Sequence, residues 1–263
     1  MEALNSPSTV NSQYKTPKNL DIRISLHQKY SVNKQGFGSW ILSHYNIPPN
    51  SEILELGCGN GSMWQGNLDV INNGSALLLT DISEGMVAAA EKALGKNEHV
   101  FFEKADIESL PYENGSFDIA IANMMLYHVP DLNKGLSEVS RVLRKNGRFY
   151  CATFGENGIV PYISGLLKEY GAADDTNKNF TLQNGGEILK KYFSEVQRYD
   201  YEDSLKVTNI EDILDYIYTM SGILSIAEIE RDKIKKTLEK NMVNGALNIP
   251  KENGMFVCEK KKY

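Results

Sequence analysis

The chain has 263 residues, of which 41% are hydrophobic and 24% charged, so it can bury a sizeable core and is not disordered as a whole. Its formal net charge of −6 gives no general basic field to hold a nucleic acid backbone, which disfavours nucleic acid as a partner. No apolar run approaches the roughly 18 residues of a membrane span, and the polar N-terminus lacks the apolar centre of a secretory signal. We therefore expect a cytoplasmic protein without a membrane partner.

The three cysteines lie far apart in the sequence, at Cys58, Cys151 and Cys258. Their spacing matches no metal-binding or disulfide framework. We therefore expect free thiols in a reducing compartment, and we expect no metal.

From Glu52 onward, short apolar runs alternate with amphipathic segments of helix length, which is typical of consecutive βαβ units. Several of the apolar runs are nearly continuous, as expected of parallel strands covered on both faces. The sequence therefore predicts an α/β fold with a doubly wound sheet. The predicted strands are 52–56, 76–81, 98–103, 117–123 and 147–154, and the predicted helices are 61–71, 83–94 and 131–144.

After residue 155 the pattern changes. One helix in this part carries an apolar stripe at helical spacing, which is typical of core, and a lid over a small, partly apolar substrate is the alternative. The stripe consists of Ile210, Ile213, Leu214, Ile217 and Tyr218. We expect helices near 158–170 and 185–192, a strand-like stretch SEVQRYDYEDSLKV, two helices broken near 221–222, and a last short strand MFVCEK.

The stretch SEILELGCGNGSMW, residues 51–64, places Glu55 at the end of a predicted strand and glycines at 57, 59 and 61. Ligands of open α/β sheets bind beyond the carboxyl ends of the strands, and glycines there let the backbone approach a ligand closely. A plain tight turn is the alternative. Ser62 stands where a dinucleotide motif needs its third glycine, and ionised Glu55 would repel a pyrophosphate. The stretch favours a cationic nucleoside ligand, and S-adenosylmethionine has that charge pattern.

Two further carboxylates follow predicted strands. Asp81 ends the second strand, where its acceptor oxygens can take both hydroxyls of a ribose, and Ile82 can lie against an adenine face. Capping of the next helix is the alternative for Asp81. Asp106 follows the third strand and can accept a hydrogen bond from an adenine amino group, with the Ile107 backbone nearby. Together with Glu55 these residues complete a predicted nucleoside site.

The stretch ANMMLYHVPD is the one expected nearest to the reacting group. Asn123 ends the fourth predicted strand, so its backbone or its amide can hold the amino group of the ligand. His128 is a candidate general base because the unperturbed pKa of histidine is about 6.5. A structural role in holding neighbouring loops is the alternative for His128, and Tyr127 is weighed in the same way.

Four segments together resemble the class I S-adenosylmethionine-dependent methyltransferases of the small-molecule type labelled type 11. They are ILELGCGNG, LLLTDIS, KADIESLPYENGSFDIAIANMMLYHVPD and LSEVSRVLRKNGRFYCATFG, and they cover about residues 50–155 in family order and spacing. The resemblance implies a Rossmann-like seven-stranded sheet, mostly parallel with an antiparallel last strand. It suggests Glu55 to Gly61, with Gly57, Cys58 and Gly59 among them, around the methionine part of the cofactor, Asp81 at the ribose, Asp106 at the adenine and Asn123 at the end of the fourth strand.

The stretch LHQKYSVNKQGFGSW resembles the leader that these enzymes place across the cofactor. Tyr30 within it is a candidate to contact the carboxylate or the sulfonium of the cofactor. Tyr30 and His27 are also candidate bases beside His128. The expected divisions are a helical N-terminal leader over 1–46, an S-adenosylmethionine-binding domain over 47–207 and 249–263, and a helical insertion over 208–248 that is a candidate substrate lid.

The resemblance implies methyl transfer from S-adenosylmethionine to a small-molecule acceptor by direct displacement, with S-adenosylhomocysteine as the other product. Alignment of the reacting groups is the main requirement of such a step. One alternative is an RNA or protein methyltransferase, which would need a local basic groove. Another is a non-catalytic S-adenosylmethionine-binding protein. The acidic charge favours the small-molecule acceptor.

Overall fold

The computed structural model describes residues 17–71, 73–220 and 222–260, which form two compact units. The helical unit contains the residues up to Gln35 with Gly155–Lys178 and Tyr201–Asn253. The sheet unit contains Gly36–Phe154, Asn179–Asp200 and the residues from Gly254 onward. The predicted division at residues 46, 207 and 248 stays a prediction, and residues 1–16 of the predicted leader lie outside the described part.

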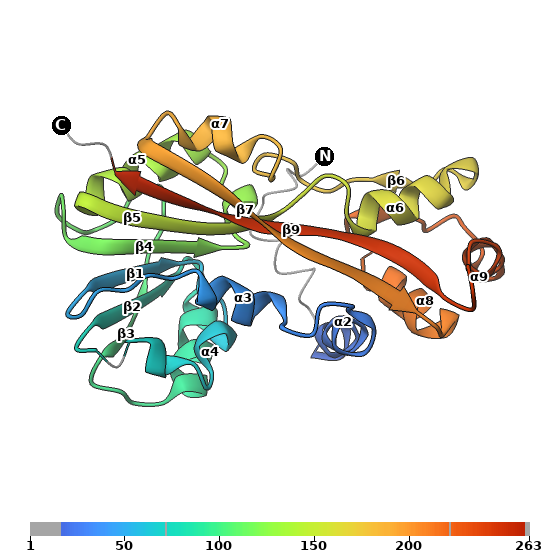
Figure 1. Ribbon diagram of the computed structural model, residues 1–263, viewed down its shortest axis with the longest axis horizontal. Coiled ribbons are helices and arrows are strands. Elements are labelled where there is room, and N and C mark those ends of the chain that lie inside the picture. Colours follow the sequence, from blue (N-terminus) through green and yellow to red (C-terminus); the bar gives the residue numbers. More distant parts are fainter. Residues whose placement is uncertain (1–16, 72, 221, 261–263) are drawn as a thin grey trace. The chain divides into compact units, whose positions relative to one another are not determined.

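A seven-stranded sheet has the strand order β3-β2-β1-β4-β5-β9-β7. The pairs β1 with β2, β2 with β3, β1 with β4, and β4 with β5 are parallel. Strand β9 runs opposite to β4 and lies between β5 and β7 (Figure 1). The predicted fold class, with its antiparallel last strand, is confirmed. The strands are β1 Glu52–Leu56, β2 Ala76–Asp81, β3 Val100–Lys104, β4 Phe117–Asn123, β5 Leu143–Phe154, β7 Phe193–Val207 and β9 Leu247–Lys260.

Side chains that alternate along the strands build a core on each face of the sheet. On one face, Leu54 of β1 packs in a cluster with Leu136 and Val139 of helix α5, Leu132–Val142. On the other face, Ile53 packs in a cluster with Ile41 of helix α3, Phe37–Ser43. Burial on both faces explains the nearly continuous apolar strands. Helices α4, Glu84–Leu94, and α7, Gly185–Leu189, complete the described helices of this unit.

The helical unit has its own apolar cluster. In helix α8, the predicted stripe residues Ile210, Ile213, Leu214 and Ile217 are buried, whereas Tyr218 is 38% exposed. This stripe is therefore part of the apolar core of the unit, which is the role typical of such stripes. Within the described ranges, no helix combines the length and apolar character needed to cross a membrane. The helices of this unit are α2 Pro17–Tyr30, α6 Ile159–Leu166, α8 Ile210–Tyr218 and α9 Arg231–Lys240, and a small sheet joins β6 Ala173–Asp174 to β8 Leu224–Ser225.

The predicted helix over 61–71 is wrong. Two short 3-10 turns, Ser62–Trp64 and Leu68–Ile71, take its place. Between them Gly66 has a φ of +72°, which an α-helix cannot accommodate. The last strand is also longer than predicted, since it begins at Leu247 rather than at Met255.

A buried ion pair joins β7 and β9 within the helical unit. Lys251 pairs with Asp203, and their side chains are 7% and 0% exposed. Lys251 Nζ also donates to the hydroxyl of Ser31 over 3.0 Å, and the backbone N–H of Asn33 donates to Asp203 over 3.0 Å. Because the charges are paired and hydrogen-bonded, their burial is tolerated. Removal of one partner alone would leave an uncompensated charge in the core.

We expect Lys251→Met to lower the free energy of unfolding by about 3–5 kcal/mol, because it leaves the Asp203 carboxylate buried without its cation. Urea unfolding at neutral pH measures this. In the double variant Lys251→Met/Asp203→Asn the loss should be smaller, since neither charge remains. Lys233→Met is the matched control, because its pair with Glu230 is exposed, and it should cost less than about 1 kcal/mol. An equal loss in both single variants would contradict this expectation.

Candidate functional site

The turn after β1 is shaped by glycines. Gly57 and Gly61 have φ values of +67° and +72°, a region that residues with a Cβ rarely adopt. A Cβ on Gly57 would lie 2.9 Å from the Cβ of Met125, so this glycine also lets the segment after β4 come close. The turn lies at the carboxyl ends of β1 and β4, where the strand order reverses. This is the place where open α/β sheets bind ligands.

Asp81 connects the glycine turn to the loop after β2. The backbone N–H of Gly59 donates to Asp81 Oδ2 over 3.0 Å, and the N–H of Ser83 donates to Oδ1 over 2.8 Å. Ser83 is the N-cap residue of α4, so Asp81 contacts the start of that helix without capping its first turn. Carboxylate oxygens accept more than one hydrogen bond, which leaves capacity for ligand hydroxyls. The ribose role of Asp81 stays a prediction.

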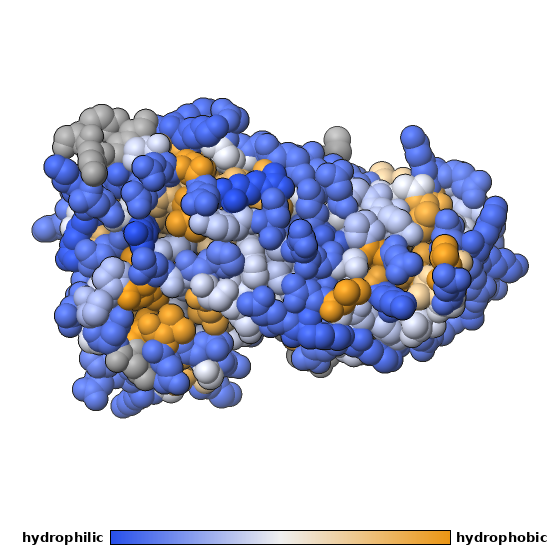
Figure 2. Space-filling view, in the orientation of Figure 1, coloured by the Kyte–Doolittle hydropathy of each residue, from blue (hydrophilic) through white to orange (hydrophobic). Residues whose placement is uncertain are grey.

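The apolar residue after Asp81 is exposed to solvent, since 59% of Ile82 is accessible. The face of the molecule drawn in Figure 2 is mostly hydrophilic, with separate hydrophobic patches. Ile107 differs, since only 6% of it is exposed and its side chain contacts the Gly135 position of α5. The carboxylate of Asp106 accepts a hydrogen bond from the N–H of Glu108 over 2.9 Å. Ile82 thus offers a side chain to a ligand, and Ile107 offers only backbone.

Glu55 lies buried in the sheet unit and is only 3% exposed. The alternation along β1 directs it to the same face as Ile53, where the indole Nε1 of Trp64 donates to Glu55 Oε2. Burial raises the pKa of Glu55 to about 7, against the opposite effect of hydrogen bonds from Trp64 and Asn123. The sequence predicts an ionised Glu55, whereas burial in the ligand-free protein favours its protonated form more than for an ordinary glutamate.

The amide of Asn123, at the end of β4, has one satisfied end and one unsatisfied end. Its Nδ2 donates to the hydroxyl of Tyr45 over 2.6 Å. Its Oδ1 is buried and has no partner among the described residues. An unpaired buried acceptor costs about 1–3 kcal/mol, so it fits a position that a ligand N–H completes. Asn123 and Glu55 together are suited to a cationic amino group.

Sequence reasoning missed three residues of this site. Tyr45 carried no motif, and Met125 carried no sign of its contact with Gly57. Met124 has a φ of +56°, strained for a residue with a long side chain, while its N–H donates to the carbonyl of Ala152 over 2.8 Å. Such backbone conformations have no signal in residue type.

His128 and Tyr127 lie after β4 in an aromatic group with Phe154. The Tyr127 ring centroid is 4.4 Å from that of His128 and 4.8 Å from that of Phe154. Burial lowers the pKa of His128, and its Nδ1 is buried without a partner in the described structure. The imidazole is therefore neutral at pH 7. The catalytic role of His128 stays a prediction.

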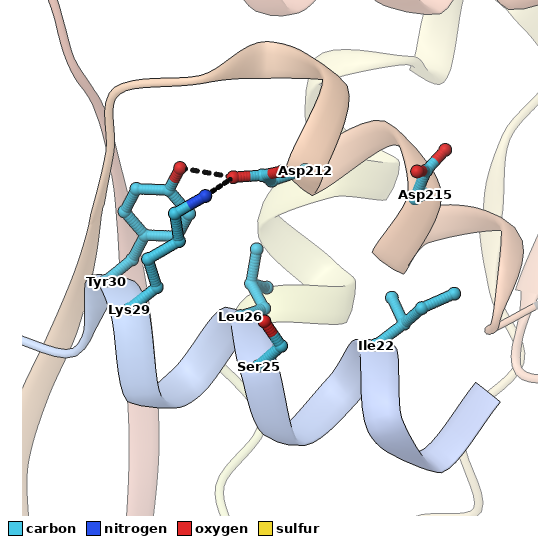
Figure 3. Close-up of a pocket in the computed structure, with 7 residues that line it drawn as sticks. All are labelled: Ile22, Ser25, Leu26, Lys29, Tyr30, Asp212 and Asp215. Carbon is cyan, nitrogen blue, oxygen red and sulfur yellow. Dashed lines mark hydrogen bonds and ion pairs between the residues drawn. The ribbon is translucent and has the colours of Figure 1, made fainter. Parts of the chain in front are cut away.

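Tyr30, at the end of α2, belongs to the helical unit. Its hydroxyl donates to Asp212, which also accepts from Lys29 over 2.5 Å (Figure 3). These residues line a pocket of about 280 Å³, whose other acid, Asp215, pairs with Arg231 over 3.0 Å. Both acids of the pocket therefore already have cationic partners. The contact of Tyr30 with a cofactor stays a prediction.

His27 also lies in the helical unit. Burial, with smaller effects of neighbouring charges such as Lys251, lowers the pKa of His27 to about 4. It is therefore a weaker base than ordinary histidine, and its role as a candidate base stays a prediction.

The remaining sequence predictions concern the cysteines and metal binding. Cys58, Cys151 and Cys258 are free thiols, as predicted, and burial raises the pKa of Cys58. Within the ranges that the structure describes, no group of three or more His, Cys, Asp or Glu side chains is placed to hold a metal ion.

The central part of the chain matches a known family. Residues 54–151 match the model described as a methyltransferase domain. The ubiquinone/menaquinone biosynthesis C-methyltransferase UbiE of Rickettsia prowazekii (strain Madrid E) is 32% identical over 127 residues, which are 46% of this chain and 49% of that protein. UbiE of Rickettsia massiliae (strain Mtu5) is 37% identical over 114 residues, which are 41% and 46% of the two chains. The matched stretch spans about half the length of these relatives.

Solved structures share the fold at low sequence identity. The YcgJ protein from Bacillus subtilis has a TM-score of 0.57 at 18% identity, covering 86% of this chain and 98% of that one. Phosphoethanolamine N-methyltransferase 2 of Haemonchus contortus, in complex with S-adenosyl-L-methionine, has 0.57 at 15%, covering 98% and 59%. The [4+2]-cyclase SpnF has 0.59 at 15%, covering 98% and 97%. These likenesses show the fold alone, which a cyclase also has.

We expect Glu55→Gln to stabilise the ligand-free protein at pH 8 but not at pH 5. The folded-state pKa of about 7 exceeds the ordinary value of 4.5, so the folded protein keeps a proton that the unfolded chain releases. Stability from this group is therefore present below pH 4.5 and is lost as the pH rises through 7. The loss is about 3 kcal/mol, and glutamine does not incur it.

Urea unfolding of wild type and variant at both pH values measures this difference. Glu52→Gln is the matched control, because Glu52 begins the same strand and is exposed. A gain for Glu55→Gln of equal size at pH 5 and pH 8 would show that the carboxyl does not titrate as described.

Proposed function

We propose that this chain, whose residues 54–151 form a domain of the S-adenosylmethionine-dependent methyltransferase family, transfers a methyl group from S-adenosylmethionine to a small-molecule acceptor. The observation that carries the proposal is the hydrogen bond of the Asn123 side chain to the buried Glu55 carboxyl, which leaves Asn123 Oδ1 buried without a partner among the described residues. Both lie at the carboxyl ends of neighbouring strands β1 and β4, beside the glycine turn. A negative carboxylate and a lone amide oxygen suit a cationic amino group.

The residues present fit the parts of this cofactor. Asp81 would hold the ribose hydroxyls, because its oxygens bind only two N–H groups in the described structure. Ile82 would cover a face of the adenine and so lose its exposure to water. Asp106 would accept from the adenine amino group. Glu55 and Asn123 would bind the ammonium of the methionine part.

The bound cofactor would supply a methyl group already activated on a sulfonium. The work of this chain is then to bind, to align and to exclude water. The glycine turn after β1 gives the ligand a close approach to backbone, and Asp81 stabilises that turn through Gly59. No residue needs to form a covalent bond with either reactant.

If the methyl acceptor must lose a proton during the transfer, His128 is the proposed general base. Its neutral imidazole keeps a ring nitrogen, Nδ1, without a hydrogen-bond partner in the described structure. Tyr30 is the second candidate, and it would first have to release Asp212.

A small-molecule acceptor is favoured over a macromolecule by the net charge of −6, which provides no general attraction for RNA. The UbiE relatives are named for the biosynthesis of ubiquinone and menaquinone, which are small molecules. A cytoplasmic location and the exclusion of membrane partners belong to the same proposal.

We expect Asp81→Ala to weaken the binding of S-adenosylhomocysteine by at least about tenfold, because hydrogen bonds to a charged group contribute about 1.5–3 kcal/mol. Isothermal titration calorimetry measures the affinity. Asp118→Ala is the matched control, since Asp118 also accepts a backbone N–H, that of Glu52, but lies at the opposite end of β4. Unchanged affinity in Asp81→Ala would show that the ribose is held elsewhere.

Incubation of a cell extract with the purified protein and isotopically labelled methyl donor tests the activity itself. We expect mass spectrometry to find label in small metabolites only. Label in RNA or protein would overturn the acceptor class. Tight binding of S-adenosylhomocysteine without any labelled product would favour a non-catalytic binding protein.

A further inference from the structure

Resting on the proposed function, we propose that Tyr45 is a positioning residue that fixes the side-chain amide of Asn123, so that Oδ1 is the atom presented to the ammonium group of the bound nucleoside. Tyr45 lies between helix α3 and strand β1. It acts through Asn123 and touches no reacting atom.

The direction of the Asn123 amide decides whether this site attracts or repels a cation. The amide oxygen is an acceptor, whereas the amide nitrogen carries two N–H donors. A reversed amide would present N–H donors to an ammonium, which is itself only a donor, and would turn Oδ1 toward the acceptor oxygens of Glu55. An unfixed amide would therefore reduce the affinity for the amino acid end of the ligand.

Two acceptors hold the amide in the required direction. Nδ2 donates to the Tyr45 hydroxyl over 2.6 Å, and the Asn123 side chain also forms a hydrogen bond to Glu55. Oδ1 is left buried and without a partner among the described residues. Both donors of the amide are thus engaged, and the acceptor end is free for a ligand.

Tyr45 is itself held firmly. Its ring centroid is 5.0 Å from that of Tyr150 and 6.3 Å from that of Trp64. The next residue, Asn46, donates its backbone N–H to the Tyr150 hydroxyl over 3.1 Å. Burial raises the pKa of Tyr45 well above its ordinary value, so the phenol stays neutral at working pH. The neutral hydroxyl accepts from Nδ2, while the ionised Glu55 carboxylate, which can only accept, selects this direction of the amide.

The test separates the two ends of the ligand in Tyr45→Phe, which keeps the ring and removes the hydroxyl. Calorimetry measures the dissociation constants of S-adenosylhomocysteine, which carries the ammonium, and of 5′-methylthioadenosine, which lacks the amino acid end. We expect the first to rise about tenfold and the second to change less than about twofold. The ratio of the two affinities is a readout that a general loss of stability would not move.

Tyr192→Phe is the matched control. Tyr192 lies in the same unit, is also partly buried, and its hydroxyl donates to Asn133 Oδ1 over 2.9 Å rather than bonding Asn123. We expect it to leave the ratio of affinities unchanged. Tyr45→Phe in an Asn123→Ala background should likewise have no further effect on the ratio, because the group through which Tyr45 acts is gone.

Each outcome decides between the two proposals. If the wild type binds neither compound, the proposed function fails and the positioning role fails with it. If the wild type binds both and Tyr45→Phe weakens both equally or neither, only the positioning role is overturned. If Tyr45→Phe does not fold, the chemical shift of the ¹³Cζ resonance of Tyr45 is measured in the wild type instead. That resonance should shift with S-adenosylhomocysteine but not with 5′-methylthioadenosine, and an equal shift with both would overturn the role.

Discussion

The candidate site depends on one hydrogen bond, from the indole of Trp64 to the buried carboxyl of Glu55. A carboxyl inside a core is costly unless it is hydrogen-bonded. The bond requires Trp64 to come back to the end of β1 soon after the glycine turn, which the 3-10 turn Ser62–Trp64 does. The same aromatic layer positions Tyr45 and hence Asn123. The conformation of the turn, the packing of the core and the charge of the site therefore depend on one another.

Sequence reasoning succeeded where residue type and spacing carry the signal. Strands 52–56, 76–81 and 117–123 were predicted with their observed bounds, because parallel strands buried on both faces read as continuous apolar runs. The helix over 61–71 failed because apolar spacing hid the left-handed Gly66. The boundary of β9 failed because polar residues such as Lys251 are buried there by pairing.

The residues that could not be predicted are those whose role depends on distant partners. Tyr45 meets Asn123 across 78 positions of sequence, and neither residue indicates the other. Likewise, Gly57 was recognised for its flexibility, but its contact with Met125 follows only from the approach of β1 to β4. Sequence reasoning identified the type of each residue but not the distant residue that it contacts in the fold. Function has the same limit, since SpnF shows that a cyclase shares this fold.

The place of β9 in the sheet bears on how the chain is made. Strand β7 reaches the rest of the sheet only through β9, because β9 lies between it and β5. Residues 193–207 therefore have no strand to pair with in this sheet until residues 247–260 have been synthesised. During translation β5 remains an edge strand of the sheet, and pairing with β9 later covers that edge.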